Sequence, residues 1–253
     1  MKQRFGLTIF VVALVLLAGC VGGTGSTDPA DEPDDGTDGE VMIVDNRTAA
    51  VLDAGGYTSV WEMEFTTERD GVSTTRYTHA VDYVNERSSF GMLMTNRDEV
   101  TNDYESFYAD GTSYVRYGDG EEATYQTAPG EFTPENTLFS VESSITSGSD
   151  LSEFSVVGTE TYDGVTVTRY ERSDQPAWIA AQGTDDEFTW TAFDYAVLVD
   201  EDGLVRYDSW TGEGVDGEGV EQTMTFSYSL TDVGSTVVED PDWLTAAGEQ
   251  TDA

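Results

Sequence analysis

Residues 57–67 read YTSVWEMEFTT, and this stretch decides the fold class. Its large apolar residues, Trp61, Met63 and Phe65, alternate with Glu62 and Glu64. Successive side chains of a strand point to opposite faces of a sheet, so a period of two residues predicts a strand with one apolar face.

The same alternation recurs later in the sequence, in residues 77–83, 90–94 and 224–230. Asp-Gly pairs separate the strands, and such pairs supply the positive φ angles of tight hairpins. The pairs lie at residues 70–71, 110–111, 119–120, 163–164 and 202–203. We therefore predict a largely antiparallel meander of strands, each with one apolar face.

The residues before the first strand predict a helix. Residues 41–54 place their apolar side chains near one helical face, and Gly55-Gly56 follows as a suitable helix end. A one-sided sheet also needs cover. Either the sheet curves on itself or a second sheet packs against it, and two irregular apolar stretches, 128–150 and 173–187, are expected to lie across its open side as short helices or loops.

The N-terminus has the layout of an export signal. Lys2 and Arg4 precede an uncharged apolar run that ends at Leu17-Ala18-Gly19-Cys20. This ending looks like a lipobox, which predicts that residues 1–19 are a lipoprotein signal peptide, that cleavage precedes Cys20 and that Cys20 carries a lipid. An uncleaved membrane anchor is the alternative, although the run is shorter than the roughly 20 residues that span a bilayer as a helix.

Three further regions follow from composition. Residues 20–40 are rich in Gly, Thr, Asp, Pro and Ser, which predicts an acidic flexible tether. Residues 41–245 have the length of one β domain. Residues 246–253 are expected to be a disordered C-terminal tail.

The charge of the chain is extreme, because 50 acids face 11 basic residues for a formal net charge of −39. Removing residues 1–19 takes away Lys2 and Arg4 but no acid, which gives −41. Such repulsion is screened only in concentrated salt, where the Debye length falls to about 3 Å near 1 M. The composition therefore indicates a halophile, and it excludes nucleic acid as a partner.

The residues that carry most enzyme chemistry are scarce. His79 and Cys20 are the only histidine and cysteine, so paired-histidine zinc sites and Cys-His catalysis are excluded. His79 is expected to be a core or rim histidine. The sequence has no nucleophile elbow and no phosphate-binding glycine loop. We expect no enzyme activity, no catalytic residue, no metal site and no cofactor.

Two short motifs remain. Residues 200–203 read DEDG, but the bidentate Glu and the spacing of a calcium loop are missing, so a hairpin turn is expected. Asn46-Arg47-Thr48 is a glycosylation sequon, which makes Asn46 a candidate modification site.

The order of several short segments resembles a known group of proteins. They include Ala49-Ala50-Val51-Leu52 before Tyr57-Thr58-Ser59-Val60, then residues 107–115, 156–165 and 199–205. In this order, over about residues 41–244, the chain resembles the haloarchaeal surface lipoproteins related to the LolA, LppX and LprG group of lipoprotein carriers and lipid-binding lipoproteins. The resemblance implies a mainly β (α+β) fold, in which a strongly curved antiparallel sheet forms an unclosed half-barrel. It also implies an N-terminal helix and short helices or loops on the concave face, with apolar space that holds acyl chains.

These observations lead to one functional hypothesis and two alternatives. The hypothesis is a lipoprotein on the outer face of the cell membrane, anchored through the lipid on Cys20, that binds or presents a lipid or other apolar ligand. The candidate ligand-lining residues are those expected to share the apolar face: Trp61, Met63, Phe65, Met92, Met94, Met224, Phe226 and Tyr228. The alternatives are a structural or protein-interaction module with a filled core and, less favoured, an enzyme that acts on surface glycans. The sequence does not identify a protein partner.

Overall fold

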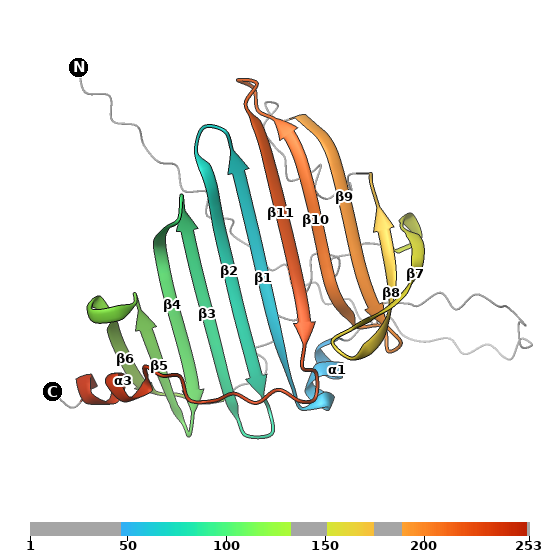
Figure 1. Cartoon of the computed structure of the whole chain (residues 1–253). Coiled ribbons are helices and arrows are strands. Elements are labelled where there is room, and N and C mark those ends of the chain that lie inside the picture. Colours follow the sequence, from blue (N-terminus) through green and yellow to red (C-terminus); the bar gives the residue numbers. More distant parts are fainter. Residues whose placement is uncertain (1–46, 133–150, 175–188, 252–253) are drawn as a thin grey trace, which may run out of the picture. The chain divides into compact units, whose positions relative to one another are not determined.

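The computed structural model describes residues 47–132, 151–174 and 189–251, all within the unit formed by residues 40–253. Every described strand belongs to one 11-stranded antiparallel sheet (Figure 1). The strands in chain order are β1 (Gly56–Thr67), β2 (Gly71–Asp82), β3 (Arg87–Asn96), β4 (Glu99–Ala109), β5 (Thr112–Tyr117), β6 (Thr124–Pro129), β7 (Ser155–Tyr162), β8 (Val165–Arg172), β9 (Thr189–Asp200), β10 (Val205–Val215) and β11 (Glu221–Thr231).

The strand order runs β6-β5-β4-β3-β2-β1-β11-β10-β9-β8-β7. The first and last strands are therefore neighbours in the middle of the sheet, joined from Thr58 opposite Thr231 to Thr67 opposite Gln222. The two edge strands, β6 and β7, lie at opposite sides of the sheet (Figure 1). The prediction of a mainly β fold with an unclosed antiparallel sheet is confirmed.

The Asp-Gly pairs mark turns, though not all of one kind. At Asp110-Gly111 and Asp163-Gly164 both residues have positive φ angles, between 49° and 78°, as tight two-residue hairpins require. The pair at residues 119–120 differs, because Asp119 has a φ of −130° and caps the short 3-10 helix η1 (Gly120–Glu122) between β5 and β6. There the sequence signal for a tight hairpin was wrong, since the aspartate carboxylate accepts the Gly120 amide and starts a helical turn instead.

A short helix, α1 (Arg47–Ala54), precedes the sheet. The expected helix began at residue 41, and residues 41–46 lie outside the described part of the chain. Gly55 ends the helix with a φ of 93°, and its amide donates to the Leu52 carbonyl at 3.1 Å. The predicted glycine helix end is thus confirmed.

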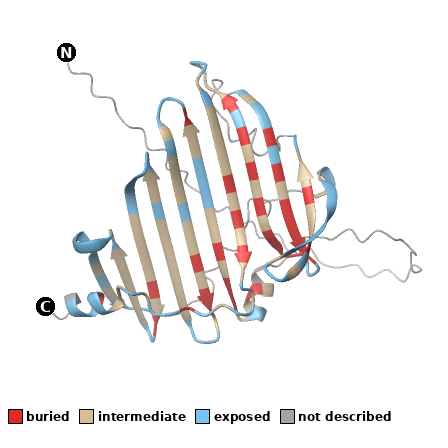
Figure 2. Cartoon of the chain, viewed as in Figure 1, coloured by how far each residue is buried: buried red, intermediate tan, exposed pale blue. Residues whose placement is uncertain are grey.

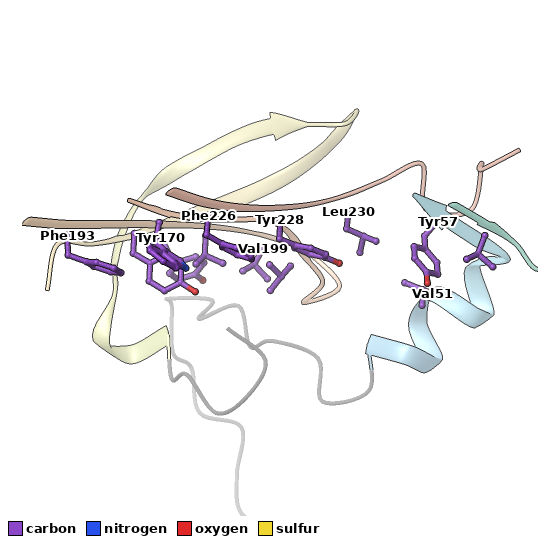
Figure 3. Packing of buried hydrophobic residues seen from close by; sticks show 13 residues of the cluster. Val51, Tyr57, Tyr170, Phe193, Val199, Phe226, Tyr228 and Leu230 are labelled. Carbon is purple, nitrogen blue, oxygen red and sulfur yellow. The ribbon is translucent and has the colours of Figure 1, made fainter. Parts of the chain in front are cut away.

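The main core lies on one face of the sheet, where Val51 of α1 joins buried residues of β1, β2 and β8–β11 (Figure 3). Tyr57, Tyr228 and Leu230 are at most 1% exposed in this cluster. The two stretches expected to cover this face, 128–150 and 173–187, fall largely outside the described residues, so that expectation is untested.

The C-terminal segment packs on the other face of the sheet. Phe107 and Ala109 of β4 enclose Val238, and the helix α3 (Leu244–Thr251) follows against β5 and β6. The tail predicted to be disordered from residue 246 is therefore helical as far as Thr251. The prediction failed because Trp243 and Leu244 bury their apolar surface on the sheet, a tertiary contact that polar composition does not reveal.

Candidate functional site: the aromatic face

The strand register brings all eight candidate lining residues to one face of the sheet. Directly opposed residues of neighbouring strands point to the same side. On β1 and β11, Trp61 opposes Tyr228, Met63 opposes Phe226 and Phe65 opposes Met224.

Met92 and Met94 of β3 reach this face through β2. Tyr77 stands between Trp61 and Met92, and Thr75 stands between Met63 and Met94. We call the side of the sheet that carries these residues the aromatic face. The register places the eight residues together, whereas their role as ligand contacts stays a prediction.

Aromatic rings form a row across the strands of this face. Phe193, Trp210 and Phe226, on β9, β10 and β11, stack nearly parallel with centroids 5.8 and 5.9 Å apart. Trp61 of β1 meets Phe226 edge-on at 5.5 Å. The row thus crosses the central β1–β11 pairing without a break.

Rings continue across β2 to β5. Tyr77 contacts Phe90 at 6.1 Å, Phe90 contacts Tyr104 at 5.9 Å, and Tyr104 contacts Tyr117 at 5.3 Å between centroids. Since these strands hold one face in register, a nearly continuous band of rings runs across the sheet from β9 to β5.

Burial divides the aromatic face into two parts. In what we call the packed half, on β8–β11, Phe193, Trp210 and Phe226 are 5%, 8% and 4% exposed. In what we call the open half, on β1–β5, Met63 and Tyr117 are 44% and 42% exposed. Seven further residues of the open half are half-buried: Trp61, Phe65, Tyr77, Phe90, Met92, Met94 and Tyr104. Figure 2 shows buried residues concentrated on β8–β11.

The open half closes at the end of the strands next to α1. Tyr57, His79 and Val81 are at most 6% exposed there. His79 meets the rings of Tyr57 and Phe90 edge-on at 5.9 and 6.0 Å. Burial lowers the pKa of His79 to about 4, because desolvation penalises the charged imidazolium. The prediction of a core or rim histidine is confirmed.

A glycine makes room for one ring of the packed half. The register shift between Glu213 and Gly214 sets Trp190 against Gly214 on the aromatic face. A Cβ atom on Gly212 would lie 2.1 Å from the Trp190 ring. The absence of a side chain at Gly212 therefore leaves the space that the Trp190 ring occupies. The sequence WTGEG at residues 210–214 does not predict this contact.

A carboxylate also lies within the aromatic face. Asp208 of β10 is fully buried between Tyr228 and Val197 in the register. Sequence reasoning missed this residue, since one acid among 50 gives no signal of its own.

The DEDG segment forms the connection between β9 and β10. The Asp200 carboxylate accepts the amides of Asp202 and Leu204, and Arg206 Nε donates to its second oxygen at 2.6 Å. Both side chains of this ion pair are under 10% exposed. The predicted hairpin turn is confirmed, and its carboxylate is engaged by donors rather than arranged as a cation ligand.

Eight arginines, from Arg69 to Arg206, make ion pairs, and most of these pairs lie at the surface. Over the described ranges no three acids, histidines or cysteines gather where they could hold a metal ion.

The opposite face of β8–β10 carries a shallow depression of about 310 Å³. Apart from Ala196, its lining on that face is polar: Arg169, Glu171, Asp194, Ser209 and Thr211. Because it lies on the other side of the sheet, this depression does not test the apolar ligand site.

Cys20 and Asn46 lie outside the described residues, so neither lipidation nor glycosylation is tested. Neither α1 nor α3, each of eight residues, is long and apolar enough to cross a membrane.

These features define a class of protein: a mainly β chain built on one unclosed antiparallel sheet with an apolar, aromatic face. The particular family follows from the sequence comparison. The chain belongs to a family of unknown function, DUF7537, whose model matches residues 6–247. Comparison with the curated proteins finds no match.

Solved structures with a similar arrangement include LprF from Mycobacterium bovis, at 10% identity and a TM-score of 0.33, covering 78% of this chain and 95% of that one. A second is the LolA superfamily protein NE2245 from Nitrosomonas europaea, at 9% identity and a TM-score of 0.20, covering 77% and 95%. A third is a β-barrel-like DUF1849 protein from Brucella abortus, at 12% identity and a TM-score of 0.22, covering 73% and 99%. Similarity at this level transfers neither a ligand nor a function.

Proposed function

We propose that this protein is a lipid-anchored surface protein of a halophile whose open half binds the hydrocarbon part of a lipid or another apolar ligand. One observation carries the ligand proposal. A single face of rings and methionines runs across the sheet. Its rings are buried on β8–β11, whereas Met63 and Tyr117 on β1–β5 are more than two-fifths exposed.

The energetics favour an occupant for this surface. Covering apolar surface is worth roughly 25 cal/mol per Å², so a hydrocarbon chain laid on the open half gains in proportion to the area it hides. Met63, Met92 and Met94 suit such a chain, because the flexible thioether adapts to irregular partners. The rings beside them provide a rigid floor.

The anchoring proposal rests on the sequence alone. The apolar run before Cys20 and the tether after it are those of a lipoprotein, and the charge of −39 is that of a protein exposed to brine. The lipid on Cys20 would hold the chain at the outer face of the membrane, and an anchored chain presents a ligand locally instead of carrying it over a distance.

The ligand proposal is tested by native mass spectrometry of the full chain carrying Cys20→Ser, so that recovered lipid cannot be the anchor. We expect an apolar molecule to accompany the folded chain. Met63→Glu should reduce its recovery roughly tenfold, because a carboxylate in an apolar contact costs more than 1.4 kcal/mol.

Leu93→Glu is the matched control. Leu93 is 40% exposed, close to the 44% of Met63, but it lies on the other face, since its neighbour Met94 is on the aromatic face. Equal recovery of the apolar molecule from the two variants would reject the ligand proposal. A spectrum that shows protein alone for the Cys20→Ser chain with an unaltered aromatic face would reject it as well. The protein-interaction alternative, which the filled packed half favours, would then stand.

The anchor is tested separately by cell fractionation. Cys20→Ser should leave the chain exported but released from the membrane, because one lipid-bearing cysteine is the only proposed attachment. Full retention together with an unprocessed N-terminus would show that the apolar run of residues 5–18 is the anchor.

A further inference from the structure

The edge strand β7 is the most exposed strand of the sheet. Seven of its eight residues are exposed, all but Tyr162. Val156 and Val157 are 65% and 55% exposed, and they are neighbours in the sequence. The register with β8 shifts between Val156 and Gly158, so Val157 is the extra residue of a bulge. Two adjacent valines therefore face solvent together.

The first five residues of this edge strand are also uncharged. Residues 155–159 read SVVGT and carry no charge, although the chain as a whole has a formal net charge of −39. Sheet edges are usually protected by charged residues, proline or a covering element, because their free N–H and C=O groups pair with other strands. Glu160 is the one charged residue of β7 and lies near its end. Within residues 155–159 a bulge is the one such device that the described part of the chain shows, and it exposes apolar side chains.

The other edge of the sheet is also uncharged, but it is shorter and partly covered. β6 has six residues and ends at Pro129, which has no N–H to donate. α3 packs against β6, and Trp243 stacks on Tyr125 with centroids 6.0 Å apart. The two edges are thus unequal, and β7 is the one suited to accept a strand.

We propose that β7 pairs with β7 of a second copy of this chain, antiparallel about a two-fold axis at Val157. Val157 then opposes its counterpart, and Ser155 of each copy opposes Thr159 of the other. The five opposed pairs of residues 155–159 contain no charge, and the exposed valines gather at the centre.

Charge and symmetry select this occupant. In the antiparallel pairing the two Glu160 residues lie six positions apart along the ladder, roughly 20 Å at 3.3 Å per residue. A parallel pairing would set them about 4.8 Å apart, the spacing between strands. Pairing of β7 with β6 of another copy would be a head-to-tail contact that grows into filaments, whereas β7 with β7 closes as a dimer.

The pairing is expected to be weak and to depend on salt. One short strand from each copy falls well below the area of a stable interface. The acidic copies repel each other until salt screens them. We therefore expect monomers near 0.1 M salt, where the Debye length is about 10 Å, and dimers at high protein concentration near 3 M salt, where it is below about 3 Å.

Sedimentation of the full chain across this salt range tests the dimer. Val157→Lys should weaken dimerisation at least roughly tenfold, because two hydrated ammonium groups would replace the apolar valine contact at the axis. Val84→Lys, at a valine 79% exposed in the turn between β2 and β3, is the matched control and should leave dimerisation unchanged. Monomers at every salt concentration, or equal weakening by both variants, would overturn the proposal.

A cysteine scan locates the axis. In the full chain with Cys20→Ser the introduced cysteine is the only one. Under oxidation Val157→Cys should form a covalent dimer, since opposed Cβ atoms lie about 4.5–5.5 Å apart. Glu160→Cys and Val84→Cys should not, and comparable yields at all three positions would show random collision and reject the pairing.

Discussion

The packed half and the open half of the aromatic face arise from the same alternating pattern, yet only one of them is buried. Phe226 on β11 is 4% exposed, and it opposes Met63 of β1. Phe65, two residues after Met63 on the same face, is half-buried. Alternation therefore assigns a side chain to a face of the sheet but does not say what covers that face. Stability should depend on the packed half, and ligand binding on the open half.

The largest expected difference lies between two phenylalanines. Phe226→Ala should lower the free energy of unfolding by about 3–5 kcal/mol, because it leaves a cavity beneath stacked rings. Phe65→Ala should cost no more than about half as much, since its ring is already in partial contact with water. Denaturant unfolding at one high salt concentration measures both. Equal losses would mean that the open half is covered in solution and would break the comparison.

A second comparison uses two arginines. Arg206→Gln should cost about 3 kcal/mol, because it leaves the buried Asp200 carboxylate without its cation. Arg76→Gln removes a pair with Glu62 in which both side chains are about half exposed, and it should cost under about 1 kcal/mol. Thermal unfolding of both variants checks the contrast. A large effect at Arg76 would show that surface ion pairs, and not burial, dominate the stability of this acidic chain.

The smallest expected effect is the pH dependence of stability that comes from His79, which lies at the buried α1 end of the open half. The pKa of His79 falls from 6.5 to about 4 in the folded chain, so folding favours the neutral ring. Its contribution to stability is complete above pH 6.5 and is lost as the pH falls toward 4, by about 1.4 kcal/mol at pH 5.5.

His79→Leu should remove this part of the pH dependence, measured as the difference in unfolding free energy between pH 8 and pH 5.5. The acids titrate in both chains, so their contribution cancels in the comparison. Identical pH slopes for the two chains would mean that water reaches the imidazole and that the face is open as far as α1.

Much of the sheet could be predicted from the sequence. The alternation of apolar and polar residues in β1, β3 and β11 correctly placed eight residues on one face. The Asp110-Gly111 pair correctly predicted a hairpin, because both residues adopt positive φ angles. The position of Gly55 ended α1 as expected.

Other features had no local signal. Trp190 reaches the aromatic face only because β9 bulges and Gly212 leaves it space, and both are facts of packing. The helix α3 is stabilised because Trp243 and Leu244 pack against the cluster of Phe107, Ala109 and Val238 on the sheet. Asp208 was hidden by the abundance of acids, and the strand order required the long-range pairing of β1 with β11.

That central pairing has a consequence for how the chain folds. Each half of the sheet consists of hairpins between strands that follow one another, whereas the join between the halves links Thr58 to Thr231, near opposite ends of the domain. Contacts between residues so distant in the sequence are slow to form, because the loop entropy is lost before the contact is gained. The two meanders can take shape early, but the domain becomes one cooperative unit only once its last strand has been synthesised and has found the first.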